Sequence, residues 1–314
     1  SAEALESAKT LYVEQGKINE YESFLQSSGK SLSAIQKDSL RYQYVQSSVS
    51  TADIPLARRS MSQYLSEFPN GLFAIEVEHL QAELYLDEKD WVNAAKSFAN
   101  LAERGASRYQ EKALRQAARL YFFEVKDYEK AANLFQQLTS SSSKSEITLE
   151  ALRGEVRSRY YLKQWMAGIR AAEQLLSNSK ANPDDVSFAA IILGYFSQMN
   201  KEYEKSSASF ERVVIGNQSG LATEARYQLA WNKVEQGNLI EGEQLSSKAI
   251  ESSGSNEYWI TKSYILLGRI FLQQKDYFNA QATYQSVYEN ANDPSLRKEA
   301  LEKIEVVKKN EKGN

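Results

Sequence analysis

The chain has 314 residues, a formal net charge of −3, 42% hydrophobic residues and 25% charged residues. These proportions are those of a folded, water-soluble protein, and the small net charge gives no electrostatic reason to expect a nucleic acid or an anionic membrane as a partner. The sequence has no cysteine, which excludes disulfides and thiolate metal sites. No apolar run approaches the ~20 residues that a membrane-spanning helix needs.

The chain begins Ser1-Ala2-Glu3 rather than with methionine, as expected for a processed or trimmed piece of a longer protein. The lack of a targeting segment therefore excludes no compartment. A length of 314 residues would allow about two ordinary domains. Helical periodicity instead continues along the sequence. Each unit of a solenoid packs only on its neighbours, so a solenoid of this length needs no division into domains. We therefore predict a single solenoid over residues 1–314.

Apolar residues recur at the spacing of amphipathic helices, beginning with Ala4, Ala8, Leu11 and Tyr12. The pattern predicts eight pairs of helices and one final helix. The pairs cover residues 4–28, 33–68, 72–103, 107–138, 146–177, 184–215, 221–252 and 256–290, and the final helix covers residues 294–310. All four prolines fall at the boundaries of these helices, whereas a proline inside a helix would cost about 3 kcal/mol.

The stretch 139–145 separates the fourth and fifth pairs and contains five serines. Two interpretations stay open for it: a solvated loop between repeats, or a flexible joint between two shorter solenoids. The final helix places its apolar residues on one stripe, formed by Leu296, Ala300, Ile304 and Val307. A helix at the end of a solenoid covers the last repeat with its apolar face and exposes a polar face to solvent. We therefore interpret this helix as a cap.

A residue at the turn of each pair recurs at steps of 36 to 38 residues, which marks a repeat architecture. These anchor residues are Ile18, Ile54, Trp91, Tyr128, Trp165, Tyr203, Leu239 and Tyr277. The residue three positions after the anchor is small in every pair but the first, as at Ala94, Ala131 and Ala280. The residue seven positions after it is mostly bulky. This pattern predicts close helix–helix contact at the same place in each pair.

The last three pairs also carry Leu193-Gly194, Leu229-Ala230 and Leu267-Gly268 at a fixed distance before the anchor. With the turn aromatic and the small and bulky positions, this pattern resembles the tetratricopeptide repeat, over about residues 4–291. The resemblance implies an all-α protein without strands. Its expected form is a right-handed superhelical solenoid of about eight helical hairpins with a C-terminal capping helix.

The sequence offers no catalytic constellation, no metal site and no cofactor motif. Its one histidine, His79, has no metal-ligand spacing around it, so we interpret it as a surface or groove residue. Acidic residues precede five anchors, and at the start of a helix they are expected to be N-caps. They are Asp53, Asp90, Asp127, Glu202 and Asp276.

In the family that the chain resembles, first helices line a groove that holds ligands. Residues eight and twelve positions before the anchor are implied to face it. In the second half of the chain these positions combine the residue types enriched at binding hot spots. The candidate partner-binding residues are Arg153, Arg157, Tyr195, Tyr227, Trp231 and Arg269. The alternative for each aromatic residue is packing against neighbouring helices. Some members of this family bind the C-terminal carboxylate of a chaperone through lysines and asparagines at fixed groove positions. Here Tyr195, Trp231 and Arg269 stand at such positions, so this kind of binding is not expected.

These observations favour a non-enzymatic scaffold that binds a protein or peptide segment in its concave groove. One alternative is a carbohydrate-active enzyme on a helical-hairpin toroid, which would need two acids about 5–10 Å apart. Another is a spacer segment, without a ligand, of a larger multi-repeat protein. Residues 64–71, Tyr-Leu-Ser-Glu-Phe-Pro-Asn-Gly, are similar to repeat ends of bacterial periplasmic and outer-membrane-associated members of the family. This favours a bacterial envelope assembly.

Overall fold

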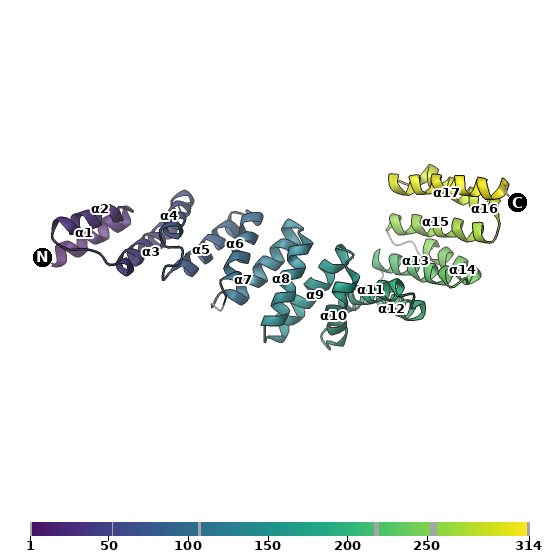
Figure 1. Cartoon of the computed structure of the whole chain (residues 1–314), viewed down its shortest axis with the longest axis horizontal. Helices are drawn as coiled ribbons and strands as arrows, with labels where there is room; N and C mark the ends of the chain where they lie inside the picture. Colours follow the sequence, from purple (N-terminus) through teal and green to yellow (C-terminus); the bar gives the residue numbers. More distant parts are fainter. Residues whose placement is uncertain (1, 52, 106–107, 217–219, 252–255, 313–314) are drawn as a thin grey trace. The chain divides into compact units, whose positions relative to one another are not determined.

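The computed structural model describes residues 2–51, 53–105, 108–216, 220–251 and 256–312. The described residues form seventeen α-helices, one π-helical stretch and no strand. Successive helices pair as antiparallel hairpins (Figure 1). The prediction of an all-α solenoid of helical hairpins is therefore confirmed, whereas the right-handed sense of the superhelix stays a prediction.

The chain divides into two compact units, Ser1–Gly154 and Glu155–Asn314. The helices of the first are α1 (Ala2–Glu14), α2 (Ile18–Ser27), α3 (Ala34–Ser50), α4 (Ile54–Glu67), α5 (Ala74–Asp87), α6 (Trp91–Glu103), α7 (Gln110–Leu120) with the π-helical η1 (Tyr121–Val125), and α8 (Tyr128–Ser141). Helix α9 (Ser145–Tyr161) crosses the boundary. The second unit continues with α10 (Trp165–Ser177), α11 (Pro183–Met199), α12 (Tyr203–Gly216), α13 (Gly220–Glu235), α14 (Leu239–Glu251), α15 (Glu257–Gln273), α16 (Tyr277–Asn290) and α17 (Pro294–Lys312).

Every anchor residue is the first residue of the second helix of its hairpin. The predicted unit limits at residues 107 and 252 lie outside the described residues, and the division into repeat units stays a prediction. The prolines lie at helix boundaries, as predicted, with Pro183 and Pro294 each opening a helix and Pro55 in the first turn of α4.

In seven of the eight hairpins, the turn has the same backbone conformation. Two residues before the anchor, the chain adopts positive φ at Gly16, Lys89, Lys126, Lys163, Lys201, Gly237 and Lys275. At Lys89, the N–H bonds to the carbonyl of Leu86 (3.1 Å), and the next N–H, of Asp90, bonds to that of Tyr85 (2.9 Å). This is the Schellman pairing that satisfies the last carbonyls of a helix. A lysine there also places a positive charge at the negative end of the helix dipole.

In four hairpins, the residue before the anchor is an aspartate that caps the second helix. Asp53, Asp90, Asp127 and Asp276 each accept a hydrogen bond from a backbone N–H in the first turn, which confirms them as N-caps. The fifth predicted cap, Glu202, accepts from the side chain of Lys205 at 3.1 Å. Between α5 and α6, for example, the three residues 88–90 end one helix and begin the next.

The turn conformation leads to a stability prediction at Gly237, whose φ is +80°. We expect Gly237→Val to destabilise the protein by about 1–2 kcal/mol, because a side chain with a branched Cβ strains a left-handed backbone. No described atom lies within 4 Å of the position that a Cβ would take, so the cost is one of backbone conformation and not of packing. Gly237→Lys is the matched control and should cost less, since lysines occupy the equivalent turns. Urea unfolding of both variants measures this, and equal stability of the valine variant and wild type would contradict it.

Small residues on one helix of a hairpin receive large side chains from the other. A methyl group added at Gly194 would lie 2.7 Å from Cε1 of Phe210, and one added at Gly268 would lie 2.7 Å from Cε1 of Tyr284. Phe210 and Tyr284 are fully buried. The predicted contact residues Ala94, Ala131 and Ala280 are also fully buried, which confirms the register assigned to the repeat.

The final helix buries one stripe of side chains. Leu296, Ala300, Ile304 and Val307 of α17 are at most 2% exposed, and they form one core cluster with Ala280 and Tyr284 of α16. The predicted apolar face of this helix is therefore the one that covers the last hairpin.

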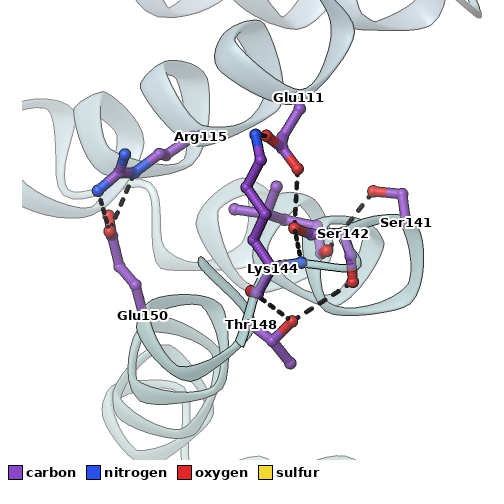
Figure 2. Close-up of polar contacts among 8 residues, drawn as sticks. Glu111, Arg115, Ser141, Ser142, Lys144, Thr148 and Glu150 are labelled. Atoms are coloured by element: carbon purple, nitrogen blue, oxygen red, sulfur yellow. Dashed lines mark hydrogen bonds and ion pairs between the residues drawn. The ribbon is translucent and has the colours of Figure 1, made fainter. Parts of the chain in front are cut away.

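The serine-rich stretch between α8 and α9 is largely helical. Helix α8 continues through Ser141 and α9 begins at Ser145, so that only residues 142–144 connect them. Glu111 of α7 accepts hydrogen bonds from Ser142 Oγ (2.8 Å) and from Lys144 Nζ (Figure 2). These bonds, that from Lys144 foremost, lower the pKa of Glu111. The connection is thus tied to the preceding hairpin, and a flexible joint at 139–145 stays a prediction.

Candidate functional site

A cavity of about 550 Å³ opens in the second unit, and most of its walls are aromatic. It is lined by Tyr160, Tyr161, Lys163, Trp165, Tyr195, Glu224, Tyr227, Gln228, Trp231, Tyr258, Trp259 and Lys262. Most of these residues come from α9, α11, α13 and α15, which are the first helices of successive hairpins. Lys163 lies in the turn before α10, and Trp165 is the first residue of α10. Because the same face of each first helix recurs along the unit, one wall collects residues that are far apart in sequence.

The rings of the cavity pack on one another. Trp165 stacks on Tyr195 with ring centroids 4.3 Å apart. Tyr227 lies against Trp259 at 5.3 Å, and Trp231 meets Tyr203 edge-on at 6.1 Å. Such pairs stabilise the wall by about 0.5–1.5 kcal/mol each beyond the area they bury. The aromatic residues therefore pack against neighbouring helices and also line the cavity, and their role in binding a partner stays a prediction.

Below the rings, a polar network joins three helices. Glu224 of α13 is 3% exposed and accepts hydrogen bonds from the hydroxyls of Tyr160 (2.6 Å) and Tyr195. The hydroxyl of Tyr195 in turn accepts a bond from Gln228 Nε2 (2.8 Å), and Gln228 Oε1 accepts one from Gln198 Nε2 (3.0 Å). Buried polar groups of this kind fix side chains in place when each has a partner.

Burial shifts the ionisation of this network. Desolvation raises the pKa of Glu224 above its ordinary value, against the opposing effect of the tyrosine hydrogen bonds and of Lys163. Burial and the neighbouring Glu224 raise the pKa of Tyr160 and of Tyr195. Both tyrosines therefore keep their protons over the whole physiological range and act as donors to Glu224.

The structure brings together three of the six predicted partner-binding residues. Tyr195, Tyr227 and Trp231 line the aromatic cavity. Arg157 instead forms ion pairs with Asp184 (2.6 Å) and Asp185 (3.5 Å).

The two remaining arginines are not among the residues that line the aromatic cavity. Arg269 pairs with Glu235 at 2.8 Å. Arg153 belongs to the first unit, where it lines a separate cavity with Arg115, Lys144 and Glu150. Arg115 Nε donates to Glu150 at 2.9 Å there (Figure 2). Whether any of the six binds a partner stays a prediction.

Sequence reasoning missed six further residues that line the cavity: Lys163, Glu224, Gln228, Tyr258, Trp259 and Lys262. Trp165 was identified only as a turn anchor, and Tyr160 and Tyr161 were not assigned to a binding site. A wider search of the first helices, beyond two fixed offsets from the anchor, would have found Trp259. Nothing in the sequence distinguishes Glu224 from the many solvated glutamates.

Signs of other chemistry are limited. No group of three or more His, Asp and Glu side chains among the described residues could hold a metal ion, and none of the described helices is long and apolar enough to cross a membrane. His79 is half-buried, stacks on Tyr109 (4.2 Å) and lies 3.2 Å from Glu83. Burial and the nearby Lys112 lower its pKa.

No protein-family model and no curated protein matches the chain. Solved structures do resemble it at low identity. A type IV pilus biogenesis factor, PilW, is 16% identical with a TM-score of 0.48, over 71% of this chain and 97% of that one. YrrB, described as a tetratricopeptide-repeat protein with an unusual peptide-binding site, is 17% identical with a TM-score of 0.46, over 67% and 98%. A tetratricopeptide-repeat protein from Parabacteroides merdae is 16% identical with a TM-score of 0.42, over 85% and 98%.

The fold defines an α-solenoid built from helical hairpins. The solved structures that resemble it include two that are described as tetratricopeptide-repeat proteins.

Proposed function

We propose that this protein is a non-enzymatic scaffold that binds a segment of another protein along the first-helix wall of its second unit. The observation that supports this most strongly is the aromatic cavity, in which eight of the twelve lining residues are Tyr or Trp. Large rigid rings contribute contact area at low entropic cost, and Trp and Tyr are enriched at binding hot spots. Hydrogen bonds from Tyr160 and Tyr195 to Glu224 also fix the orientation of these two rings before a partner binds.

The carbohydrate-active enzyme considered from the sequence needs a pair of carboxylates that flank the substrate. Among the described residues that line the cavity, Glu224 is the single carboxylate, and it already accepts bonds from two tyrosines. The geometry therefore supports binding better than hydrolysis.

We extend the proposal to a bacterial envelope assembly only on the sequence of residues 64–71. Fractionation of the native cells tests this extension by itself. Recovery of the protein with cytoplasmic markers would remove the extension and leave the binding proposal intact.

Trp231→Ala is the variant that tests the proposed binding wall. We expect the substitution to weaken binding of a captured partner by about 2 kcal/mol or more, because Trp231 lines the cavity about one helical turn after Tyr227 and Gln228 on α13. The partner is first obtained by pull-down from the native extract and then titrated against both forms by calorimetry.

Phe278→Ala is the matched control, since Phe278 is an aromatic residue of α16 that is 81% exposed and lies outside the cavity lining. Circular dichroism should show that both variants remain folded. If the partner binds Trp231→Ala as tightly as wild type and responds to Phe278→Ala, the binding surface lies on the second helices and the proposal is wrong.

A further inference from the structure

The side chains that line the cavity of the second unit offer more hydrogen-bond donors than free acceptors. Five of its lining side chains can only donate hydrogen bonds: Lys163, Lys262, Trp165, Trp231 and Trp259. The principal acceptors are already used inside the protein. Glu224 accepts from two tyrosines, and the amide oxygen of Gln228 accepts from Gln198. The wall therefore offers a ligand ring faces and donors.

The charge of the lining has the same bias. Lys163 and Lys262 are cationic, whereas the carboxylate of Glu224 is 3% exposed beneath the tyrosines. Lys262 contacts both carboxylate oxygens of Glu299 at 3.1 Å, which holds its ammonium at the wall. Lys163 stands in the left-handed turn position, with φ of +55°, so the backbone fixes where its side chain leaves the chain.

A complementary ligand must be rich in acceptors, poor in donors and flat enough to lie on aromatic rings. A proline-rich segment in the polyproline II conformation has these properties: its carbonyls face outward without internal hydrogen bonds, its prolines lack N–H groups, and its rings lie flat on aromatic residues. Such a segment is also extended before it binds, which reduces the entropy lost on binding.

Other ligand classes fit the wall less well. A saccharide brings as many hydroxyl donors as acceptors, and the carboxylate and amide oxygens of the lining that could accept from them are already bonded. An amphipathic helix satisfies its own backbone groups and would leave the indole and ammonium donors of the wall without partners.

We infer that the aromatic cavity of the second unit recognises a proline-rich segment that carries acidic residues. Prolines of this segment lie on the rings of Trp165, Trp231 and Trp259, and its carbonyls accept bonds from the indole N–H groups. A carboxylate of this segment pairs with Lys163, because Lys262 is already paired with Glu299. This inference rests on the proposed function and specifies the chemistry of the partner.

A random peptide library displayed on phage tests this inference with the whole protein as bait. We expect the selected peptides to be enriched in proline and in Asp or Glu, relative to the unselected library. Synthetic versions are then titrated by intrinsic fluorescence, a direct readout because three of the four tryptophans of the chain line the cavity. We expect Trp231→Ala to raise the Kd at least tenfold.

A pair of turn variants isolates the charge contribution. Lys163→Asn removes the ammonium and keeps a residue type that tolerates positive φ. Lys201→Asn makes the same change at the equivalent turn of the next hairpin, outside the cavity lining. We expect the acidic proline peptides to lose severalfold in affinity with Lys163→Asn and to keep it with Lys201→Asn.

The outcomes separate the two proposals. Selected peptides without proline enrichment that still depend on Trp231 would overturn the inference and leave the proposed function standing. Binding of cellohexaose or chitohexaose, seen as a fluorescence change lost in Trp231→Ala, would overturn the inference in favour of a saccharide. If no peptide binding depends on the cavity residues, both the inference and the proposed function are wrong.

Discussion

Phe210→Ala is expected to destabilise the second unit by about 3–5 kcal/mol, the cost of removing a fully buried aromatic side chain. Phe210 of α12 is completely buried and belongs to a core cluster with Ile191 and Val213. Its ring also packs in a T-shaped arrangement with that of Tyr195, with centroids 5.5 Å apart. Phe210→Ala therefore also removes a packing contact of a residue that lines the cavity. Urea unfolding followed by circular dichroism measures the change in the free energy of unfolding.

The opposing glycine gives this prediction a matched test of packing. Gly194→Ala should cost about 1–3 kcal/mol through overpacking, because its methyl group would lie 2.7 Å from Cε1 of Phe210. In the double variant Gly194→Ala with Phe210→Ala the methyl group has room, so the two costs should sum to less than their separate values. Strictly additive costs would show that Gly194 and Phe210 do not pack on each other.

The sequence predicts the repeat well because its signals are local and recur. An anchor such as Trp91 or Tyr277 follows a left-handed turn and an N-cap, and each of these depends on residues a few positions apart. Buried alanines three positions after the anchor, such as Ala94, follow from the same spacing. Periodicity was therefore sufficient to place the helices, the turns and the stripe of the final helix.

The candidate site was only partly predictable, because its contacts join residues far apart in sequence. Tyr160 and Glu224 are 64 positions apart, and their hydrogen bond depends on the stacking of several hairpins. Arg157 is of a type that is common at interfaces, yet its ion pair with Asp184 is decided by a residue of the next hairpin. The residue type alone does not show whether a side chain faces a ligand or a neighbouring repeat.

Glu224→Ala is expected to be the most damaging single change within the polar network. The truncation removes the acceptor of the Tyr160 and Tyr195 hydroxyls, and a buried donor left without a partner costs about 1–3 kcal/mol. Glu224→Gln keeps a side chain of the same shape with one carbonyl oxygen, and we expect it to retain most of the stability at acidic pH.

The pH dependence of the glutamine variant tests the burial of the carboxylate. The folded-state pKa of Glu224 is raised above the ordinary value of 4.5 by desolvation. The folded protein therefore holds this proton more tightly than the unfolded chain does, and wild type loses stability as pH rises from about the unfolded value through the raised pKa. Glu224→Gln has no proton to lose there, so its stability relative to wild type should increase across this window and level off above it.

Urea unfolding of both proteins over a series of pH values, at constant ionic strength, measures this difference. Glu173→Gln is the control, because Glu173 is an exposed glutamate of α10 and its replacement should leave the pH dependence as it is in wild type. A difference between Glu224→Gln and wild type that stays constant with pH would contradict the prediction. It would mean that the hydrogen bonds from Tyr160 and Tyr195, together with the charge of Lys163, offset the cost of burying the carboxylate beneath the cavity.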